Sequence, residues 1–256
     1  MITAGLDIGS RTIKLVFYDR DAAAVLYSTV GDVSTDPAAD ALAVWRGALD
    51  AVGLAESSIA RVISTGYGRR SASFAHESCT EITCHAAGVA SVLPQARFVV
   101  DIGGQDSKAI RIADKGRVLD FVMNDRCAAG TGRFLEVAAR ILGSQVSELA
   151  EMCDWTGTVP EITSMCAVFA ESEIISLIAR GTPRPAIAAG LHTALASRVG
   201  AMARRCGMAS PIAFTGGVAQ NKAMVQALSV EFDEPLLVPP DPRITGALGA
   251  AIIAGR

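Results

Sequence analysis

Short apolar runs with period-two alternation occur twice in the chain, and the same triplet interrupts both. The first run covers residues 2–14 (ITAGLDIGSRTIK) and the second covers residues 96–110 (ARFVVDIGGQDSKAI). In each, an apolar run leads into Asp-Ile-Gly, then a small or polar turn, then another apolar run. This pattern predicts a strand–turn–strand unit at both places. The triplets begin at Asp7 and Asp101, 94 residues apart, which indicates an internal duplication.

Helical periodicity fills much of the remaining sequence. It predicts helices over residues 37–52, 129–142, 167–180 and 185–205, and a C-terminal helix from Thr245. The segment PIAFTGGVAQNKAMVQAL reads as a strand, a glycine turn and a helix. The alternation of strands and helices predicts the α/β class, with two subdomains that each contain a mixed sheet flanked by helices.

Composition narrows the function classes. The chain has 256 residues, a formal net charge of −3, and 50% hydrophobic residues against 19% charged ones. These values exclude a disordered chain and a generally basic nucleic-acid binder. No run approaches the ~18 apolar residues of a membrane-spanning helix, and the N-terminus lacks the order of a signal peptide. We therefore expect a cytoplasmic protein with no nucleic-acid or membrane partner, whose cysteines are reduced or bind metal.

The two Asp-Ile-Gly turns are typical of phosphate binding. Their glycines allow backbone N–H groups to approach an anion, and Asp7 and Asp101 would hold Mg²⁺ directly or through its waters. Two ordinary hairpin turns are the alternative, and a single triplet would favour it. Two matching triplets, with a third glycine turn at Thr215-Gly216-Gly217, favour the phosphate site. The sequence contains neither GxxxxGK(S/T) nor GxGxxG, so P-loop and Rossmann sites lack support.

The six cysteines contain no C-x-x-C pair, so no zinc or iron–sulfur site is written locally. Cys127 and Cys166 each stand just before a predicted helix, where the helix N-terminus stabilises a thiolate. Two ligands per chain are half of what a cubane needs, and a two-fold dimer would supply the rest. Spacing leaves open whether the two cysteines meet. The remaining four are interpreted as structural: Cys79, Cys84, Cys153 and Cys206.

The order of the turns DIGS, DIGGQDSK, TGGVAQN and TGALGAA resembles the sugar kinase, heat-shock protein 70 and actin superfamily of ATPases. The resemblance implies two ribonuclease-H-like subdomains that close over ATP, with the first two turns at the β- and γ-phosphates. We place the boundary near Pro94, which gives subdomains 1–94 and 95–256. We expect the C-terminal helix to pack back toward the first half.

Longer motifs resemble a narrower family, the activator ATPases of 2-hydroxyacyl-CoA dehydratases, over nearly the whole chain. They are TGYGR (65–69), EITCHAAG (81–88), NDRCAAGTGRFLE (124–136), CAVFAESEIISLIARG (166–181) and ITGALGAA (244–251). The resemblance implies a homodimer bridged by one [4Fe–4S] cluster, which Cys127 and Cys166 of each subunit hold. It also implies that ATP hydrolysis to ADP drives one-electron transfer to a dehydratase, with ferredoxin or flavodoxin as the donor.

Each residue of the nucleotide site then has an expected role. Gln105 would orient the attacking water, while Asp7 and Asp101 position Mg²⁺. Phosphate contacts are expected from Gly9, Ser10, Thr12, Lys14, Gly103 and Gly104, and nucleoside contacts from Gly216, Gly217, Gln220, Asn221 and Arg243. Arg11 departs from the small hydroxyl residue usual after the serine. The motif leaves open whether Arg11 reaches a phosphate or points to solvent.

Three alternatives remain at this point. Benzoyl-CoA reductase ATPase subunits share the motifs but work in a hetero-oligomer, so the size of the purified protein would discriminate. A small-molecule kinase needs a base near the acceptor hydroxyl, which Gln105 and Asp106 do not exclude, but the chain is short for sugar-binding insertions. The third is a nucleotide-sensing scaffold without catalysis. Iron and sulfide in anaerobically purified protein would exclude the last two.

Overall fold

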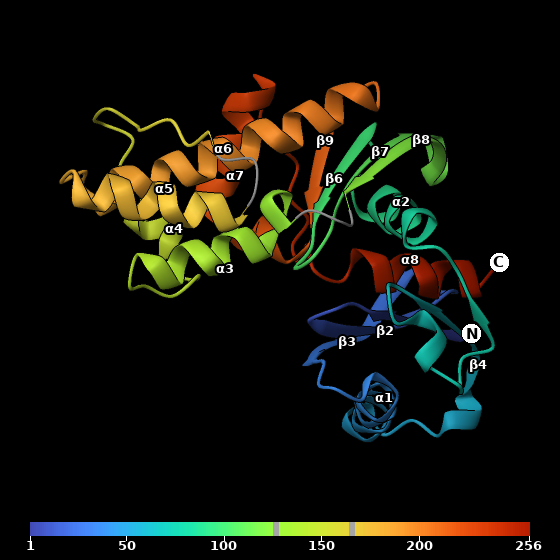
Figure 1. The fold of residues 1–256 in the computed structure, drawn as a ribbon. Helices are drawn as coiled ribbons and strands as arrows, with labels where there is room; N and C mark the ends of the chain where they lie inside the picture. Colours follow the sequence, from blue (N-terminus) through green and yellow to red (C-terminus); the bar gives the residue numbers. More distant parts are fainter. Residues whose placement is uncertain (125–127, 164–166) are drawn as a thin grey trace.

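The computed structural model describes residues 1–124, 128–163 and 167–256, which form two mixed β-sheets with helices between and outside them (Figure 1). The first sheet has five strands in the order β3-β2-β1-β4-β5. Its strands are β1 (Ile2–Ile8), β2 (Thr12–Asp19), β3 (Ala24–Asp32), β4 (Ile59–Thr65) and β5 (Glu77–Ser78). Strand β1 lies at the centre, because it pairs antiparallel with β2 and parallel with β4.

Helix α1 (Pro37–Val52) covers the outer face of this sheet (Figure 1). It begins where Asp36 accepts a hydrogen bond from the backbone of Ala39, followed by Pro37 in the first turn. Trp45 of this helix packs edge-on against Phe17 of β2, with ring centroids 5.6 Å apart. The apolar positions whose helical spacing predicted a helix over residues 37–52 are therefore the ones that α1 buries against the first sheet.

The second sheet has four strands in the order β8-β7-β6-β9, which repeats the arrangement β3-β2-β1-β4 of the first. Its strands are β6 (Phe98–Ile102), β7 (Ser107–Ala113), β8 (Arg117–Asn124) and β9 (Ile212–Thr215). The helices packed on its outer face are α3 (Gly132–Ile141), α4 (Leu149–Met152), α5 (Ala167–Ala179), α6 (Arg184–Arg205) and α7 (Lys222–Phe232). The predicted α/β class with two mixed sheets is confirmed.

One predicted helix begins later than expected. The sequence favoured a helix from residue 129, but a 3₁₀ turn at Ala128–Gly130 precedes α3. Thr131 has extended backbone angles (φ −137°, ψ 173°), which separate the turn from the helix. Further 3₁₀ turns lie at Glu56–Ser58, Arg69–Ser71, Asp114–Gly116 and Gly217–Gln220.

Helices α2 (Glu81–Val92) and α8 (Thr245–Ala254) form the layer between the two sheets (Figure 1). Helix α2 packs its apolar side on the second sheet, and α8 packs on the first. Their backbones touch, since a Cβ on Gly249 would lie 1.7 Å from the carbonyl oxygen of Cys84. Each half of the chain thus sends one helix toward the other half's sheet, and the division at residues 94 and 95 stays a prediction.

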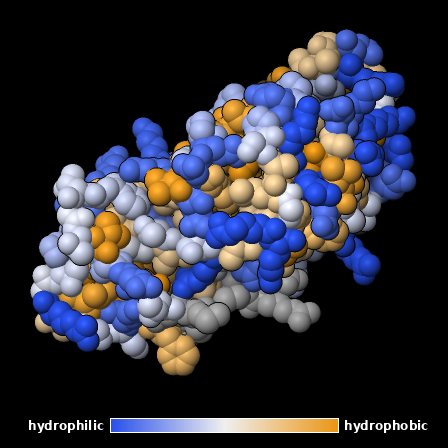
Figure 2. All heavy atoms as spheres, turned by 90° about the horizontal axis from the view of Figure 1, so that it is seen from above, coloured by the Kyte–Doolittle hydropathy of each residue, from blue (hydrophilic) through white to orange (hydrophobic). Residues whose placement is uncertain are grey.

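No helix within the described ranges has the length and apolar character that a membrane span requires. The face seen in Figure 2 shows hydrophobic residues in separate patches among hydrophilic ones.

Candidate nucleotide site

The two Asp-Ile-Gly turns close in the same way. In the first, the backbone N–H of Gly9 donates to the carbonyl of Thr12 at 3.0 Å. In the second, Gly103 donates to the carbonyl of Asp106 at 2.9 Å. Each turn links the central strand of its sheet to the next antiparallel strand. The local geometry therefore agrees with the duplication expected from the sequence.

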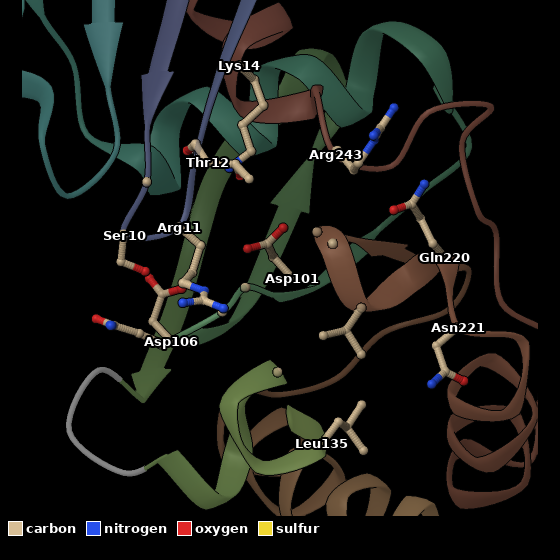
Figure 3. Close-up of a pocket in the computed structure, with 18 of the residues that line it drawn as sticks. Ser10, Arg11, Thr12, Lys14, Asp101, Asp106, Leu135, Gln220, Asn221 and Arg243 are labelled. Carbon is tan, nitrogen blue, oxygen red and sulfur yellow. Dashed lines mark hydrogen bonds between the residues drawn. The ribbon is translucent and has the colours of Figure 1, made fainter. Parts of the chain in front are cut away.

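A cavity of about 1230 Å³ lies between the turns and is lined from both sheets. Every residue that the sequence assigned to nucleotide, Mg²⁺ or water lines it: Asp7, Gly9, Ser10, Arg11, Thr12, Lys14, Asp101, Gly103, Gly104, Gln105, Gly216, Gly217, Gln220, Asn221 and Arg243. In Figure 3 the side chains of Ser10 and Arg11 lie across the cavity from those of Gln220 and Asn221. Segments far apart in the sequence thus converge on one space large enough for a nucleotide.

Asp101 lies at the centre of a buried charge cluster. Its Oδ1 accepts a hydrogen bond from Thr215 Oγ1 at 2.8 Å and lies 3.5 Å from Nδ1 of His85. Its Oδ2 lies 3.4 Å from Nζ of Lys108. Burial alone would raise the pKa of Asp101, but His85, Lys108 and Thr215 together outweigh burial and lower it to about 2. Asp101 is therefore a carboxylate at neutral pH, with both oxygens already engaged.

Lys108 lines the cavity, and sequence reasoning did not single it out. Its side chain is 2% exposed, and Nζ lies 2.6 Å from Asp106 and 2.9 Å from Glu81 in addition to Asp101. Burial alone would lower the pKa of Lys108, but the three carboxylates raise it above its usual range. A usable signal exists in the sequence, because a lysine follows the aspartate by seven residues in both repeats, at Lys14 and Lys108.

Lys14 has a different environment, although it occupies the same place in the first repeat. It faces Asp7 across the β1–β2 ladder, and its Nζ lies 3.6 Å from Asp7 Oδ2. Its side chain is 16% exposed, and Nζ makes a further 3.4 Å contact with the carbonyl of Thr12. Among the described residues a single carboxylate pairs with this cation, so Lys14 can turn toward an anion in the cavity more easily than Lys108 can.

Arg11 has a protein partner that the sequence did not predict. Its guanidinium pairs with Glu136 Oε1 of α3 at 2.9 Å, and Glu136 also binds Arg133. The stem of Arg11 lies over Gly104, where an added Cβ would come within 2.7 Å of Arg11 Cγ. Arg11 thus connects the first turn to the opposite wall of the cavity, and a contact between Arg11 and a phosphate stays a prediction.

At the other wall, two predicted nucleoside contacts are held by protein groups. Asn221 Oδ1 accepts from the backbone of Met224 and caps α7, while its Nδ2 lies 3.0 Å from Nε2 of the buried His192. Arg243 makes a two-point pair with Asp241, at 2.9 and 2.8 Å. These bonds fix the orientation of both side chains at the cavity wall before any ligand is bound.

The second turn is also bonded to α3. The backbone N–H groups of Gly132 and Arg133, at the start of that helix, donate to the carbonyls of Gly103 and Gly104, both at 2.9 Å. An added Cβ on Gly132 would lie 3.0 Å from the Gly103 carbonyl oxygen. The phosphate turn and the first residues of α3 therefore form one hydrogen-bonded unit.

The predicted cluster ligands Cys127 and Cys166 lie outside the described residues. Among the described residues, no group of three or more His, Cys, Asp or Glu side chains is arranged to hold a metal ion. The described chain resumes at Ala128 and Ala167, directly before α3 and at the start of α5. Both helices contribute to one hydrophobic cluster, through Phe134 and Ile174 among others.

Comparison with known proteins supports the motif-based assignment. The chain is 42% identical over 254 residues to the activator of lactoyl-CoA dehydratase from Anaerotignum propionicum. This match covers 99% of this chain and 97% of that protein. Among solved structures, the activator of the 2-hydroxyisocaproyl-CoA dehydratase from Clostridium difficile with bound ADPNP has a TM-score of 0.92 and 40% identity. That similarity covers 99% of this chain and 94% of the other.

A more distant likeness defines the fold. A ROK family glucokinase from Streptomyces griseus has a TM-score of 0.64 at 14% identity, covering 100% of this chain and 99% of that one. At that identity it shows only that this chain shares its fold with a sugar kinase, as the resemblance of the glycine turns predicts. The family model of the BadF/BadG/BcrA/BcrD ATPases matches residues 4–254. With this match and the 42% identity over nearly its full length, the chain belongs to the BadF/BadG/BcrA/BcrD ATPase family.

Proposed function

We propose that this chain hydrolyses ATP to drive one-electron transfer from a [4Fe–4S] cluster, shared by two copies of the chain, to a 2-hydroxyacyl-CoA dehydratase. One observation carries the proposal beyond simple nucleotide binding. The carbonyls of the phosphate turn at Gly103 and Gly104 accept hydrogen bonds from the first residues of α3. That helix follows within a few residues of Cys127, so a change at the phosphates is transmitted directly toward one cluster ligand.

Residues of the first turn would bind the phosphates. Ser10, Thr12 and Lys14 line the cavity and supply hydroxyl and ammonium donors. Asp7 and Asp101 would orient Mg²⁺, and Asp101 would do so through water because protein groups already occupy both of its oxygens. Gln105 is exposed at the cavity and would orient the attacking water, as a glutamine does in other nucleotide hydrolases.

The cluster would be held by Cys127 and Cys166 from each of two subunits, which gives the four thiolates that a cubane requires. When bound, the cluster would supply a low-potential electron. The described parts of the chain fit this arrangement, because α3 and α5, the helices that follow the two cysteines, pack together in one cluster of apolar side chains. The electron donor would be ferredoxin or flavodoxin. The acceptor would be a 2-hydroxyacyl-CoA dehydratase, the class of enzyme that the names of the relatives give as their target.

Anaerobic purification followed by iron, sulfide and size analysis tests the proposal. The expected result is about four irons for every two chains and a dimeric mass. Cys127→Ser should lose iron and ATP-dependent reduction of a dehydratase while retaining ADP binding. Cys206→Ser, which changes a buried thiol packed in the second subdomain, is the matched control and should retain both.

Two outcomes contradict the proposal. If anaerobically purified protein contains no iron but hydrolyses ATP, the chain is an ATPase and the proposed electron transfer is wrong. Dimeric protein in which Cys127→Ser keeps its full iron content would require other ligands.

A further inference from the structure

Cys79 and Cys84 form a pair of thiols at the start of α2. Thr80 caps this helix, and its hydroxyl accepts a hydrogen bond from the backbone of Thr83. Cys79 is the residue before the cap and Cys84 is the fourth residue after it. Side chains at these two positions pack against each other at the start of many helices. Here Cys79 packs against the hydrophobic cluster that contains Cys84, Ile63 and Ala250.

The two thiols differ in access and reactivity. Cys84 is fully buried, whereas Cys79 is partly exposed. Hydrogen bonding to Cys84 lowers the pKa of Cys79 to about 6, while the same contact and burial raise the pKa of Cys84. Since the thiolate is the nucleophile, Cys79 is the thiol that attacks and Cys84 the protonated neighbour that responds.

We infer that Cys79 and Cys84 are a redox-active pair that closes to an intramolecular disulfide when the protein meets hydrogen peroxide. The thiolate of Cys79 attacks one peroxide oxygen, the O–O bond breaks, and a sulfenic acid and hydroxide result. The sulfur of Cys84 then attacks the Cys79 sulfur, and the S–O bond breaks as the S–S bond forms. The two thiols lose two electrons, and the peroxide with their two protons becomes two waters.

The site lies beside the nucleotide cavity but is distinct from the proposed cluster ligands. Glu81, next to the capping residue, contacts Lys108, and His85, next to Cys84, contacts Asp101. A disulfide would fix the chain across the first turn of the helix that carries both contacts. The inference does not depend on the proposed electron transfer, because it concerns thiols on another element.

The sequence makes the test direct. Trypsin cleaves after Arg70 and Arg97, and no Lys or Arg lies between them, so one peptide carries both Cys79 and Cys84 and no other cysteine. The full-length protein, purified anaerobically and reduced, would be treated with hydrogen peroxide, alkylated after unfolding, and digested without reductant. We expect the 71–97 peptide to lose both alkyl labels and two hydrogen atoms, and dithiothreitol to restore both labels.

Two variants make the result specific. Cys79→Ser should leave Cys84 fully labelled after peroxide, and Cys206→Ser should close the disulfide like the parent protein. The inference is overturned if the 71–97 peptide keeps both labels, or if Cys79 advances to a sulfinic acid while Cys84 is still labelled. It is overturned equally if Cys84 becomes oxidised in Cys79→Ser.

Discussion

Replacement of Gly249 by alanine tests how closely the two central helices must approach. An added Cβ would lie 1.7 Å from the carbonyl oxygen of Cys84 and 2.8 Å from the backbone nitrogen of Gly88. Carbon rests about 3.3 Å from a carbonyl oxygen. The helices would therefore have to separate by roughly 1.6 Å at the point where α8 crosses α2.

The expected cost follows from what can yield. The obstructing atoms belong to the backbone of a helix packed on the second sheet, so no side-chain rotation relieves the overlap. Overpacking costs about 1–3 kcal/mol where neighbours adjust, and alanine returns about 1 kcal/mol of helix propensity. Because two helices must move together, we expect a cost above that range, about 4 kcal/mol. The net loss in the free energy of unfolding is then about 3 kcal/mol, a large part of the stability of a typical domain.

Gly47→Ala provides a matched control. Gly47 lies within α1, and nothing lies within 4 Å of its added Cβ. The same substitution should stabilise the protein there by about 0.5–1 kcal/mol.

Urea unfolding of the nucleotide-free protein, followed by circular dichroism, compares the two variants. We expect the free energy of unfolding to fall in Gly249→Ala and to rise in Gly47→Ala. A Gly249→Ala protein that does not fold at all agrees with the same expectation. A midpoint for Gly249→Ala at or above that of the parent protein would refute the reasoning that the backbones set this contact.

Three further predictions concern the charged groups of the cavity. Lys108→Met leaves buried carboxylates without their cation and should lower the free energy of unfolding by about 3 kcal/mol or more, which urea titration measures. The lowered pKa of Asp101 adds about 2 kcal/mol to the free energy of unfolding above pH ~4, and this contribution is lost as the pH falls from 4 toward 2. The free energy of unfolding of Asp101→Asn should therefore depend less steeply on pH in that window, which acid unfolding measures. Arg11→Ala and Glu136→Ala should release ADP faster by similar factors and change stability by less than about 1 kcal/mol, since the pair is partly exposed; an effect of Arg11→Ala alone would indicate a phosphate contact instead.

The sequence predicted the elements better than the contacts between them. Both strand–turn–strand units and the helix over residues 37–52 match the structure, because alternation and helical spacing are local signals. The turn before α3 was missed, since the extended backbone of Thr131 leaves no mark on hydrophobic periodicity.

Contacts between residues far apart in the sequence could not be predicted from it. His85 approaches both Asp101 and Thr245, and the latter lies 160 residues further along the chain. Arg11 and Glu136 are 125 residues apart. Periodicity shows that each residue lies on a strand end or a helix, but the partner depends on how two sheets and the helices between them are placed. The assignment of Cys127 and Cys166 to a cluster stays a prediction.

The two repeats share one backbone geometry, but their equivalent lysines have different surroundings. In the first, Lys14 pairs with Asp7 alone among the residues that the structure describes and remains 16% exposed, so its charge is free to attract a ligand. In the second, Lys108 is 2% exposed among three carboxylates, and its charge serves the fold. We therefore expect the second turn to meet a phosphate chiefly through backbone N–H groups, and the carbonyls of Gly103 and Gly104 in the same turn accept hydrogen bonds from α3. A ligand that shifts this backbone must also shift the helix, whereas a ligand that engages Lys14 need move only a side chain. We therefore expect the second turn, through its backbone bonds to α3, to pass a change in the bound nucleotide to that helix more directly than the side chain of Lys14 does.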